Sequence, residues 1–190
     1  MKQLHIITPV KDSIESTLRT IDAVLDSEIS VPFTYTIYND FSTPENTALL
    51  ENKAQHLGFQ LVHSSDRLQP PAPNYLPVLQ RESERCVQED AALLIVESDV
   101  TVKPDTLQGL WDGAMERKDC GMAASVTVDE VGKVNYPYLF ARRMGKQVTS
   151  TRHHCSFCCT LLTNELLRRV DFGLLDSTKN WFDVTISHLS

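Results

Sequence analysis

The chain has 190 residues, of which 42% are hydrophobic and 23% charged, and its formal net charge is −7. This length predicts a single domain that buries enough surface to fold without disulfides or a structural metal, and the apolar content excludes disorder throughout the chain. The negative charge argues against a nucleic-acid binder with a basic face, although a bound divalent cation would let the chain hold a small phosphorylated ligand.

Hydropathy and cysteine content bear on the cellular location. The sequence contains no run of 18 apolar residues, so no transmembrane segment is expected. Its first ten residues are too few and too strand-like for a signal peptide. We therefore expect a cytoplasmic protein, at most peripheral to a membrane, with its odd number of five cysteines reduced.

Strand and helix signals alternate through the first two-thirds of the chain. Short apolar runs predict strands, and amphipathic stretches that follow a capping residue predict helices. The expected elements are a strand at 4–8, a helix at 13–27, a strand at 35–38, a helix at 44–56, a strand at 59–62, a helix at 74–88, a strand at 91–96 and a helix at 104–117. This alternation predicts an α/β fold with a mainly parallel sheet.

The last third of the chain has weaker signals. We predict strands at 122–128 and 133–140, then an apolar segment at 158–167 that becomes helical. His153, His154, Cys155, Cys158 and Cys159 form a dense group of potential zinc ligands. A structural zinc site normally takes two spaced ligand pairs, and the second pair is missing, so we expect the cysteines to act as small apolar residues. Either histidine could instead lie on the acceptor side of a cleft.

Polar turns that carry acids follow three of the predicted strands. Pro9 and Asp12 follow the first strand, Asp40 the second, and Glu97 and Asp99 the fourth. Each acid alone is also explained as a helix cap or turn former. In an open α/β sheet, however, ligands bind beyond the carboxyl ends of the strands, so three such turns at one edge favour a ligand site. Two carboxylates two residues apart can share a hard cation with phosphate oxygens.

The ordered set of turns resembles the family 2 inverting glycosyltransferases, which have the GT-A fold. Residues 38–46 (YNDFSTPEN) match the family's V-D-D-G-S-T-D nucleotide-binding turn. The other matching segments are 9–12 (PVKD), 73–74 (PN), 95–99 (IVESD), 158–170, 171–176 (DFGLLD) and 181–187 (WFDVTIS). The resemblance covers nearly the whole chain and implies one GT-A domain at 1–190, with a Rossmann-like, mixed, mostly parallel sheet and helices on both faces. Its nucleotide-sugar-binding half would be 1–103, and its acceptor and catalytic-base half 104–190.

The resemblance implies a donor pocket for a nucleotide sugar, with UDP or GDP as the nucleotide. Asp40 would contact the base or the ribose. Pro9, Asp12 and Asn74 would line the same pocket. The protein would then be a metal-dependent, hexosyltransferase-like enzyme that moves a sugar from this donor to the hydroxyl of a glycan or another acceptor.

The resemblance also implies a cation site and a catalytic base. Glu97 and Asp99 would bind Mn²⁺ or Mg²⁺ bridging the diphosphate, with His188 as a further metal ligand. The cation would neutralise the leaving diphosphate. Asp183 would accept the proton of the acceptor hydroxyl, and attack opposite the leaving group would invert the anomeric centre. Trp181, beside the base, is either a stacking platform for a sugar ring or a core residue.

Departures from the family pattern leave alternatives open. Asn39 replaces the first acid of an acidic pair, Glu97 replaces an aspartate, and Phe182 replaces the glutamate before the base. The sequence ends seven residues past Asp183, which suggests a truncated transferase. A catalytically impaired GT-A-like module that binds a nucleotide or glycan is the alternative. A nucleotidyltransferase is disfavoured because the turn at 9–13 has no glycine and one lysine.

Overall fold

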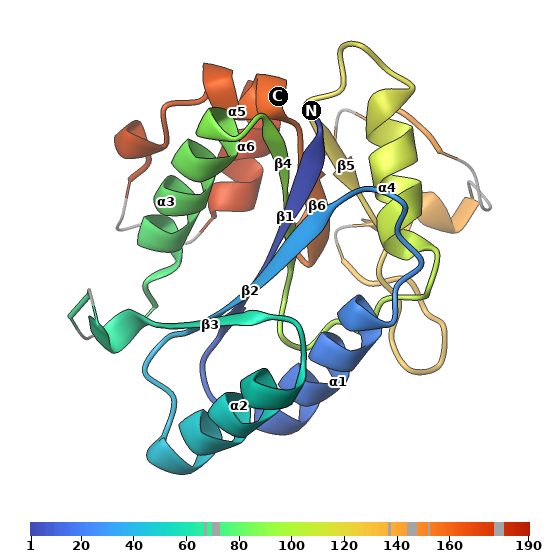
Figure 1. Ribbon diagram of the computed structural model, residues 1–190. Helices are drawn as coiled ribbons and strands as arrows, with labels where there is room; N and C mark the ends of the chain where they lie inside the picture. The colour runs from blue at the N-terminus through green and yellow to red at the C-terminus, as the bar shows by residue number, and fades with distance from the viewer. Residues whose placement is uncertain (67, 70–72, 137, 144–147, 152, 177–180) are drawn as a thin grey trace.

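The computed structural model describes residues 1–66, 68–69, 73–136, 138–143, 148–151, 153–176 and 181–190. A sheet with the strand order β3-β2-β1-β4-β6-β5 forms the centre of this described part (Figure 1). The strands are β1 (Gln3–Val10), β2 (Phe33–Asn39), β3 (Gln60–His63), β4 (Ala91–Val96), β5 (Met122–Ala124) and β6 (Cys159–Leu162). β1 to β4 pair in parallel, whereas β6 pairs antiparallel with β4 and with β5. The predicted mixed, mostly parallel sheet is confirmed.

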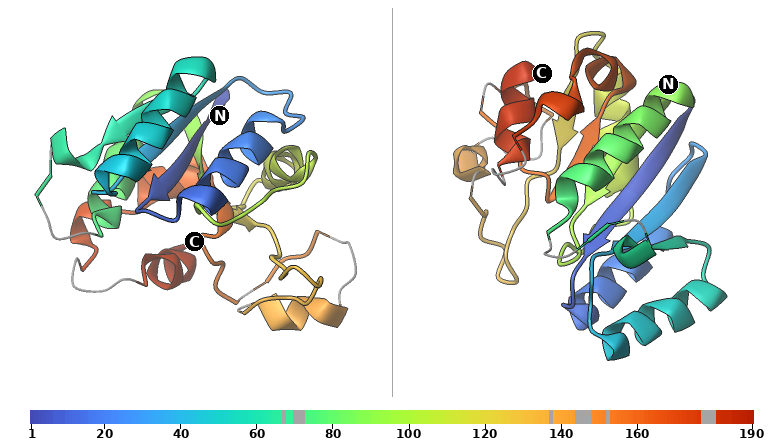
Figure 2. Two further views of the ribbon diagram at one scale, coloured as in Figure 1. Left: turned by 90° about the horizontal axis from the view of Figure 1, so that it is seen from below. Right: turned by 90° about the vertical axis from the view of Figure 1, so that its left-hand side faces the viewer.

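Helices cover both faces of the sheet (Figure 1 and Figure 2). They are α1 (Ile14–Leu25), α2 (Pro44–His56), α3 (Tyr75–Gln88), α4 (Thr106–Met115), α5 (Asn164–Arg169) and α6 (Phe182–Leu189), with short 3-10 helices η1 (Ser64–Asp66), η2 (Tyr138–Arg143) and η3 (Phe172–Leu174). Successive strand residues point to opposite faces. Leu4 and Ile6 of β1 accordingly join a core with α1, α2 and α4, whereas Ile7 joins a second core with α3, α5 and α6.

Local sequence signals account for the elements of the first two-thirds of the chain. α2 begins after Thr43, whose hydroxyl accepts a hydrogen bond from the Asn46 backbone N–H at 3.4 Å, and Pro44 is its first residue. β4 has the predicted limits of 91–96, and all of its side chains are buried. Burial on both faces is typical of a central parallel strand. The predicted alternation of strands and helices is confirmed in this region.

The segment between β5 and β6 differs from the prediction. The predicted strands at 122–128 and 133–140 are reduced to the short β5 and one isolated antiparallel bridge between Val128 and Val134. η2 occupies the end of the second predicted strand. Val128 is 50% exposed, so this stretch lacks the half-buried surface that stabilises a strand. In Figure 2 the segment, coloured yellow to orange, projects away from the sheet.

Cysteines, metal ligands and membrane segments complete the fold description. All five cysteines are free, and Cys159 is buried in β6. Among the residues that the structure describes, no group of three or more His, Cys, Asp or Glu side chains is arranged to hold a metal ion. The described helices also include none that is long and apolar enough to cross a membrane.

Candidate active site

A cavity of about 270 Å³ lies at the carboxyl ends of β1, β2 and β4. β2 and β4 flank β1 on opposite sides, so the order of the strands reverses between β1 and β4. Ligands of open α/β sheets bind in the crevice at such a reversal. The lining residues come from four segments, namely 9–11, 38 with 40, 73–75 with 78, and 97–99. The ends of three strands and the start of α3 therefore share one cavity.

Most of the predicted site residues lie at this cavity. Pro9, Asp40, Asn74, Glu97 and Asp99 line it. The convergence that was expected from the turns after the first, second and fourth strands is thus present in the structure.

Asp40 and Asn74 form a clasp across the cavity wall. The Asn74 backbone N–H donates to Oδ2 of Asp40 at 2.8 Å, and its side-chain amide donates to Oδ1 at 2.7 Å. The Asp40 backbone N–H in turn donates to the Val10 carbonyl at 2.7 Å. These bonds tie the ends of β1 and β2 to the start of α3. Each carboxylate oxygen of Asp40 retains accepting capacity, so the clasp can still bind a ligand hydroxyl or amine.

Asp12 acts on the neighbouring turn and is not among the lining residues of the cavity. Its Oδ1 accepts hydrogen bonds from the Thr43 backbone N–H at 2.8 Å and from the Asn46 amide at 3.0 Å, and these bonds lower the pKa of the carboxyl. Its backbone N–H donates to Ser42 Oγ at 2.8 Å. The Asp12 side chain therefore joins the β1–α1 turn to the start of α2.

The turn between β1 and α1 and the turn between β2 and α2 both contain residues with left-handed backbone. Asp12 and Ser13 have φ of 57° and 37°, and Phe41 has φ of 59°. Phe41 stands at the glycine position of the nucleotide-binding turn described above, and a side chain there costs about 1–2 kcal/mol in the left-handed region. Such strain concentrates at functional sites. The Asp12 hydrogen bonds hold the two strained turns together beside the cavity.

Glu97 and Asp99 line the cavity and form its acidic wall, and the charge of Asp183 on α6 acts on Glu97. Burial raises the pKa of Glu97, and the charges of Asp99 and Asp183 raise it further. The Glu97 backbone N–H donates to the Cys158 carbonyl at 2.9 Å, which continues the β4–β6 pairing one residue past the strand. The fold thus brings Asp183, the predicted base, within electrostatic reach of Glu97, one of the predicted cation ligands.

The chemistry of this acidic wall fits a divalent cation. Mg²⁺ is typically held by one or two carboxylates together with substrate phosphates, and Mn²⁺ also prefers oxygen ligands. Glu97 and Asp99 supply two such carboxylates at the cavity. His188 does not join them in a cluster of three within the described chain, and it is exposed near the end of α6. Of the predicted ligands, only Glu97 and Asp99 lie at the cavity, so these two carboxylates are the residues that could hold a cation there.

The start of α6 places Asp183 in the first turn of the helix, where the helix dipole favours a negative charge. Its Oδ1 accepts the Val184 backbone N–H at 2.8 Å. Phe182 before it is buried and stacks on the Tyr75 ring, with centroids 6.3 Å apart and planes 9° apart. Trp181 is 69% exposed, which excludes the core alternative for this residue. An exposed indole therefore lies two residues before the predicted base.

Sequence reasoning missed two tyrosines that line the cavity. The Tyr38 hydroxyl donates to Glu82 behind the cavity wall, and the Arg81 guanidinium lies 5.9 Å from its ring centre. The Tyr75 hydroxyl is buried and has no hydrogen-bond partner among the described residues. In a sequence, an aromatic residue at the end of a strand or the start of a helix has the same pattern as a core residue, so only the tertiary structure reveals these two.

A second hollow of about 610 Å³ lies between α3, α5 and η3. The Gln80 amide donates to the Phe172 carbonyl at 3.0 Å there. This hollow is larger, but the acidic turns that end β2 and β4 do not line it. Because the turns that follow β1, β2 and β4 converge only at the smaller cavity of these two, we assign the candidate site to that one.

The fold matches solved glycosyltransferase structures, although no protein-family model and no curated protein matches the sequence. S. aureus TarS (residues 1–349) superposes with a TM-score of 0.65 over 98% of this chain and 54% of its own, at 14% identity. Mannosyltransferase PcManGT from Pyrobaculum calidifontis, in complex with GDP-Man and Mn²⁺, gives 0.62 over 87% and 46%, at 15% identity.

A third structure agrees with these two. Glucosyl-3-phosphoglycerate synthase from Mycobacterium tuberculosis, in complex with Mn²⁺, UDP and glucosyl-3-phosphoglycerate, gives a TM-score of 0.57 over 89% of this chain and 59% of its own, at 14% identity. The chain therefore has the GT-A fold, as expected. It spans about half the length of the solved structures that it matches.

Proposed function

We propose that this chain is the GT-A domain of a metal-dependent inverting glycosyltransferase of the family 2 type. It would transfer a sugar, in hexosyltransferase fashion, from a UDP- or GDP-sugar to the hydroxyl of a glycan or another acceptor. The observation that carries the proposal is that Glu97 and Asp99 line a cavity formed by three strand ends, with Asp183 close enough for its charge to raise the pKa of Glu97. Structures with the same fold that are in complex with GDP-Man, UDP-GlcNAc or UDP support the donor class.

The nucleotide would bind on the side of the cavity formed by residues 1–103. The clasped Asp40 carboxylate would accept hydrogen bonds from the base or the ribose. Pro9 and Lys11 line the cavity, where Pro9 would supply an apolar wall and the Lys11 ammonium a positive charge for the phosphates. Asp12 would contribute by fixing the shape of the turn, since its carboxylate is bonded to the start of α2.

The half formed by residues 104–190 would supply the base. Asp183 takes the proton from the acceptor hydroxyl while the acceptor oxygen bonds to the anomeric carbon. The bond from that carbon to the diphosphate oxygen breaks, and the nucleoside diphosphate leaves with the electron pair. Attack on the face opposite the leaving group inverts the configuration. A divalent cation held by Glu97 and Asp99 would stabilise the negative charge on the departing diphosphate.

A thermal-shift panel tests the donor class directly. UDP, GDP, UDP-GlcNAc and GDP-mannose are each added with and without Mn²⁺. A ligand that binds only the folded state stabilises it by about 2.7 kcal/mol at one hundred times its Kd. We expect a rise in Tm for one nucleotide and its sugar, and a larger rise with Mn²⁺. A panel without any shift up to millimolar ligand contradicts the proposal.

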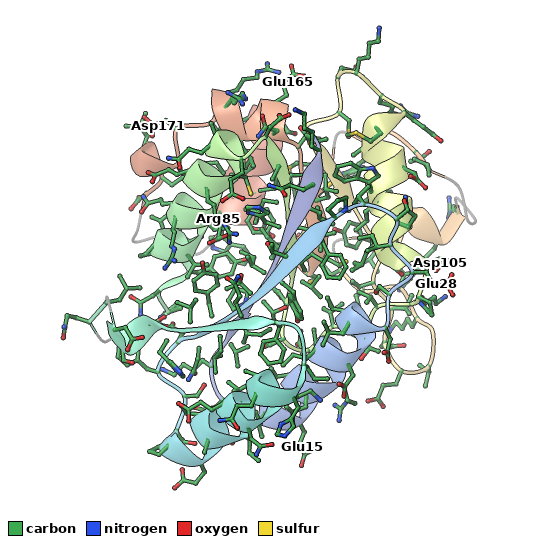
Figure 3. All side chains as sticks on the ribbon, viewed as in Figure 1. Glu15, Glu28, Arg85, Asp105, Glu165 and Asp171 are labelled. Atoms are coloured by element: carbon green, nitrogen blue, oxygen red, sulfur yellow. The ribbon has the colours of Figure 1, made fainter. Side chains whose placement is uncertain are left out.

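Substitution of the cation ligand tests the enzyme activity. Asp99→Ala should abolish transfer or donor hydrolysis and the Mn²⁺-dependent part of the thermal shift. Asp105→Ala is a matched control, because Asp105 is exposed beside α4 and its side chain makes no capping hydrogen bond (Figure 3). Undiminished turnover by Asp99→Ala contradicts the assigned role.

A binding module without catalysis is the second candidate. It is favoured by Phe182, which is packed against Tyr75 where the family pattern has an acid. Asn39 is likewise engaged, since its amide donates to Thr47 Oγ1 at 2.9 Å and lies 3.2 Å from His63 Nδ1. Nucleotide-sugar binding by calorimetry, with no product from a broad set of acceptors and no donor hydrolysis, would select this candidate.

A further inference from the structure

Tyr75 lies between the residue that binds Asp40 and the residue that precedes Asp183. It directly follows Asn74, which holds Asp40. Its ring stacks on Phe182, the residue before Asp183, and lies 6.3 Å from the ring of Phe157. The start of α3, the start of α6 and the segment before β6 thus fix this ring among them.

The Tyr75 hydroxyl is unusual for a buried polar group. It has no hydrogen-bond partner within the described part of the chain, although buried polar groups nearly always have one. Burial raises its pKa well above the ordinary value, and the charges of Glu97 and Asp183 raise it further. The hydroxyl makes no hydrogen bond to either carboxylate. It stays protonated at neutral pH and can donate one hydrogen bond.

Packing does not account for this hydroxyl. The ring contacts with Phe157 and Phe182 need only a phenyl group. A phenylalanine would make the same contacts without a buried, unpartnered polar atom. The hydroxyl therefore lacks a partner in the described part of the chain, and it belongs to a residue that lines the cavity, where a ligand could supply one.

We propose that the Tyr75 hydroxyl donates a hydrogen bond to the sugar of the nucleotide-sugar donor and thereby helps to select that sugar. This inference rests on the proposed function. In an inverting displacement the acceptor oxygen and the diphosphate oxygen lie on opposite faces of the anomeric carbon. Tyr75 lines the cavity together with Glu97, on the diphosphate side, and its ring stacks on Phe182, next to Asp183 on the acceptor side. A group between these two sides lies alongside the transferred sugar.

The variant Tyr75→Phe isolates the hydroxyl from the ring. Because the hydroxyl has no partner among the described residues, the Tm of the unliganded variant should equal or exceed that of the wild type. Calorimetry with Mn²⁺ should give unchanged affinity for UDP or GDP, whichever binds, and about tenfold weaker affinity for the matching UDP-GlcNAc or GDP-mannose. One neutral hydrogen bond gives a factor of about this size.

Tyr35→Phe is the matched control. The Tyr35 hydroxyl is also buried, but it shares a 2.9 Å hydrogen bond with the Thr8 hydroxyl and belongs to the core. Its removal should lower Tm and leave the affinity ratio of nucleotide sugar to nucleotide unchanged. The opposite responses of the two tyrosines separate a ligand contact from a structural hydrogen bond.

The outcomes distinguish this inference from the proposed function. If the wild type binds no nucleotide and no nucleotide sugar of the panel, the proposed function fails and the inference fails with it. If the wild type binds a nucleotide sugar and Tyr75→Phe binds it equally well, only the inference fails. A Tyr75→Phe variant with a lower Tm, or with equal losses for nucleotide and nucleotide sugar, also overturns the inference, because those results indicate a structural hydroxyl.

Discussion

The two sides of the cavity are held in place by different kinds of interaction. On one side, Asp40 and Glu97 each directly follow a strand, and β1, β2 and β4 are paired in a continuous parallel register. On the other side, Asp183 comes from α6, which reaches the cavity through the contact of Phe182 with Tyr75. Backbone pairing therefore positions the proposed nucleotide and cation groups, whereas side-chain packing positions the proposed base.

This difference shows which part of the site tolerates change. A residue next to a paired strand moves little unless the sheet itself is disrupted. The segment between β5 and β6 has one isolated bridge and exposes Val128, Val131, Tyr136 and Leu139. Local stability in proteins follows the density of buried contacts, so we expect the base side to open more readily than the strand side.

The largest expected effect on stability comes from comparing a buried residue of β4 with an exposed residue between β5 and β6. Leu94 in β4 is fully buried, and Leu94→Ala should lower the free energy of unfolding by about 2–5 kcal/mol. Leu139→Ala, at a residue that is 45% exposed, should change it by no more than about 0.5 kcal/mol. Urea denaturation measures both values. Similar losses for the two leucines would show that the two regions are equally well packed.

The next effect concerns the clasp between Asp40 and α3. Asn74→Ala keeps the backbone N–H that donates to Oδ2 of Asp40 but removes the side-chain donor to Oδ1, and at a residue that is only 8% exposed this loss should cost about 1–3 kcal/mol of stability. The variant should also weaken nucleotide binding, measured by calorimetry. Asn46→Ala serves as the control, because it removes a donor from the carboxylate of Asp12, where water can replace it. Equal effects of both variants would argue against a special role of the clasp.

A smaller effect, of opposite sign, is expected at the acidic wall. The folded state raises the pKa of Glu97 above 4.5, so its ionised form destabilises the unliganded fold. This penalty is absent below pH 4.5 and develops as the pH rises through the folded pKa. Glu97→Gln should therefore raise the Tm of the unliganded chain at pH 7, with no gain below pH 4.5, and should lose the stabilisation by Mn²⁺.

The Glu97→Gln variant also tests whether the charge that would bind a cation lowers the stability of the unliganded fold. Asp105→Ala, at the exposed residue beside α4, should change neither the Tm nor the response to Mn²⁺. A Glu97→Gln variant that is less stable than the wild type at pH 7 would mean that the charge of Glu97 supports the fold.

The smallest expected effect is a dependence of stability on pH that arises from His5 on the strand side. His5 in β1 is 1% exposed, and its Nε2 lies 2.9 Å from Glu89 Oε2. Burial lowers its pKa, and the charge of Arg85 on α3 (Figure 3) lowers it further, against the opposing effect of Glu89 and Glu82. The unfolded chain binds a proton near pH 6.5 and the folded chain only at lower pH, so stability should fall as the pH decreases below 6.5.

Chemical denaturation at pH 7, 6 and 5 measures this dependence. His5→Gln should flatten the decline between pH 7 and pH 5, whereas His56→Gln, at an exposed residue of α2, should leave it unchanged. A wild-type stability that rises on acidification would show that Glu82 and Glu89 dominate the environment of His5.

The sequence was sufficient for the architecture and for part of the site. β4 and α2 were predictable because burial and capping depend on residues a few positions apart, as in the apolar run 91–96 and the Thr43-Pro44 pair. The acids after the strands were predictable for the same reason, since a parallel sheet brings the ends of its strands to one edge. The strands expected at 122–128 and 133–140 were largely wrong, because Val126, Val128 and Tyr136 are 47%, 50% and 75% exposed and cover little buried surface.

The amino-acid sequence by itself determined a mostly parallel α/β sheet with Pro9, Asp40, Asn74, Glu97 and Asp99 at one edge. Only the tertiary structure decided where the side chains of Asp12, Asp183 and Tyr75 lie and what they contact. It bonds Asp12 to the start of α2, brings Asp183 near Glu97, and leaves the Tyr75 hydroxyl buried without a partner among the described residues. The physical reason is range: strands and caps follow from neighbouring residues, whereas these arrangements depend on contacts between side chains that lie far apart in the chain.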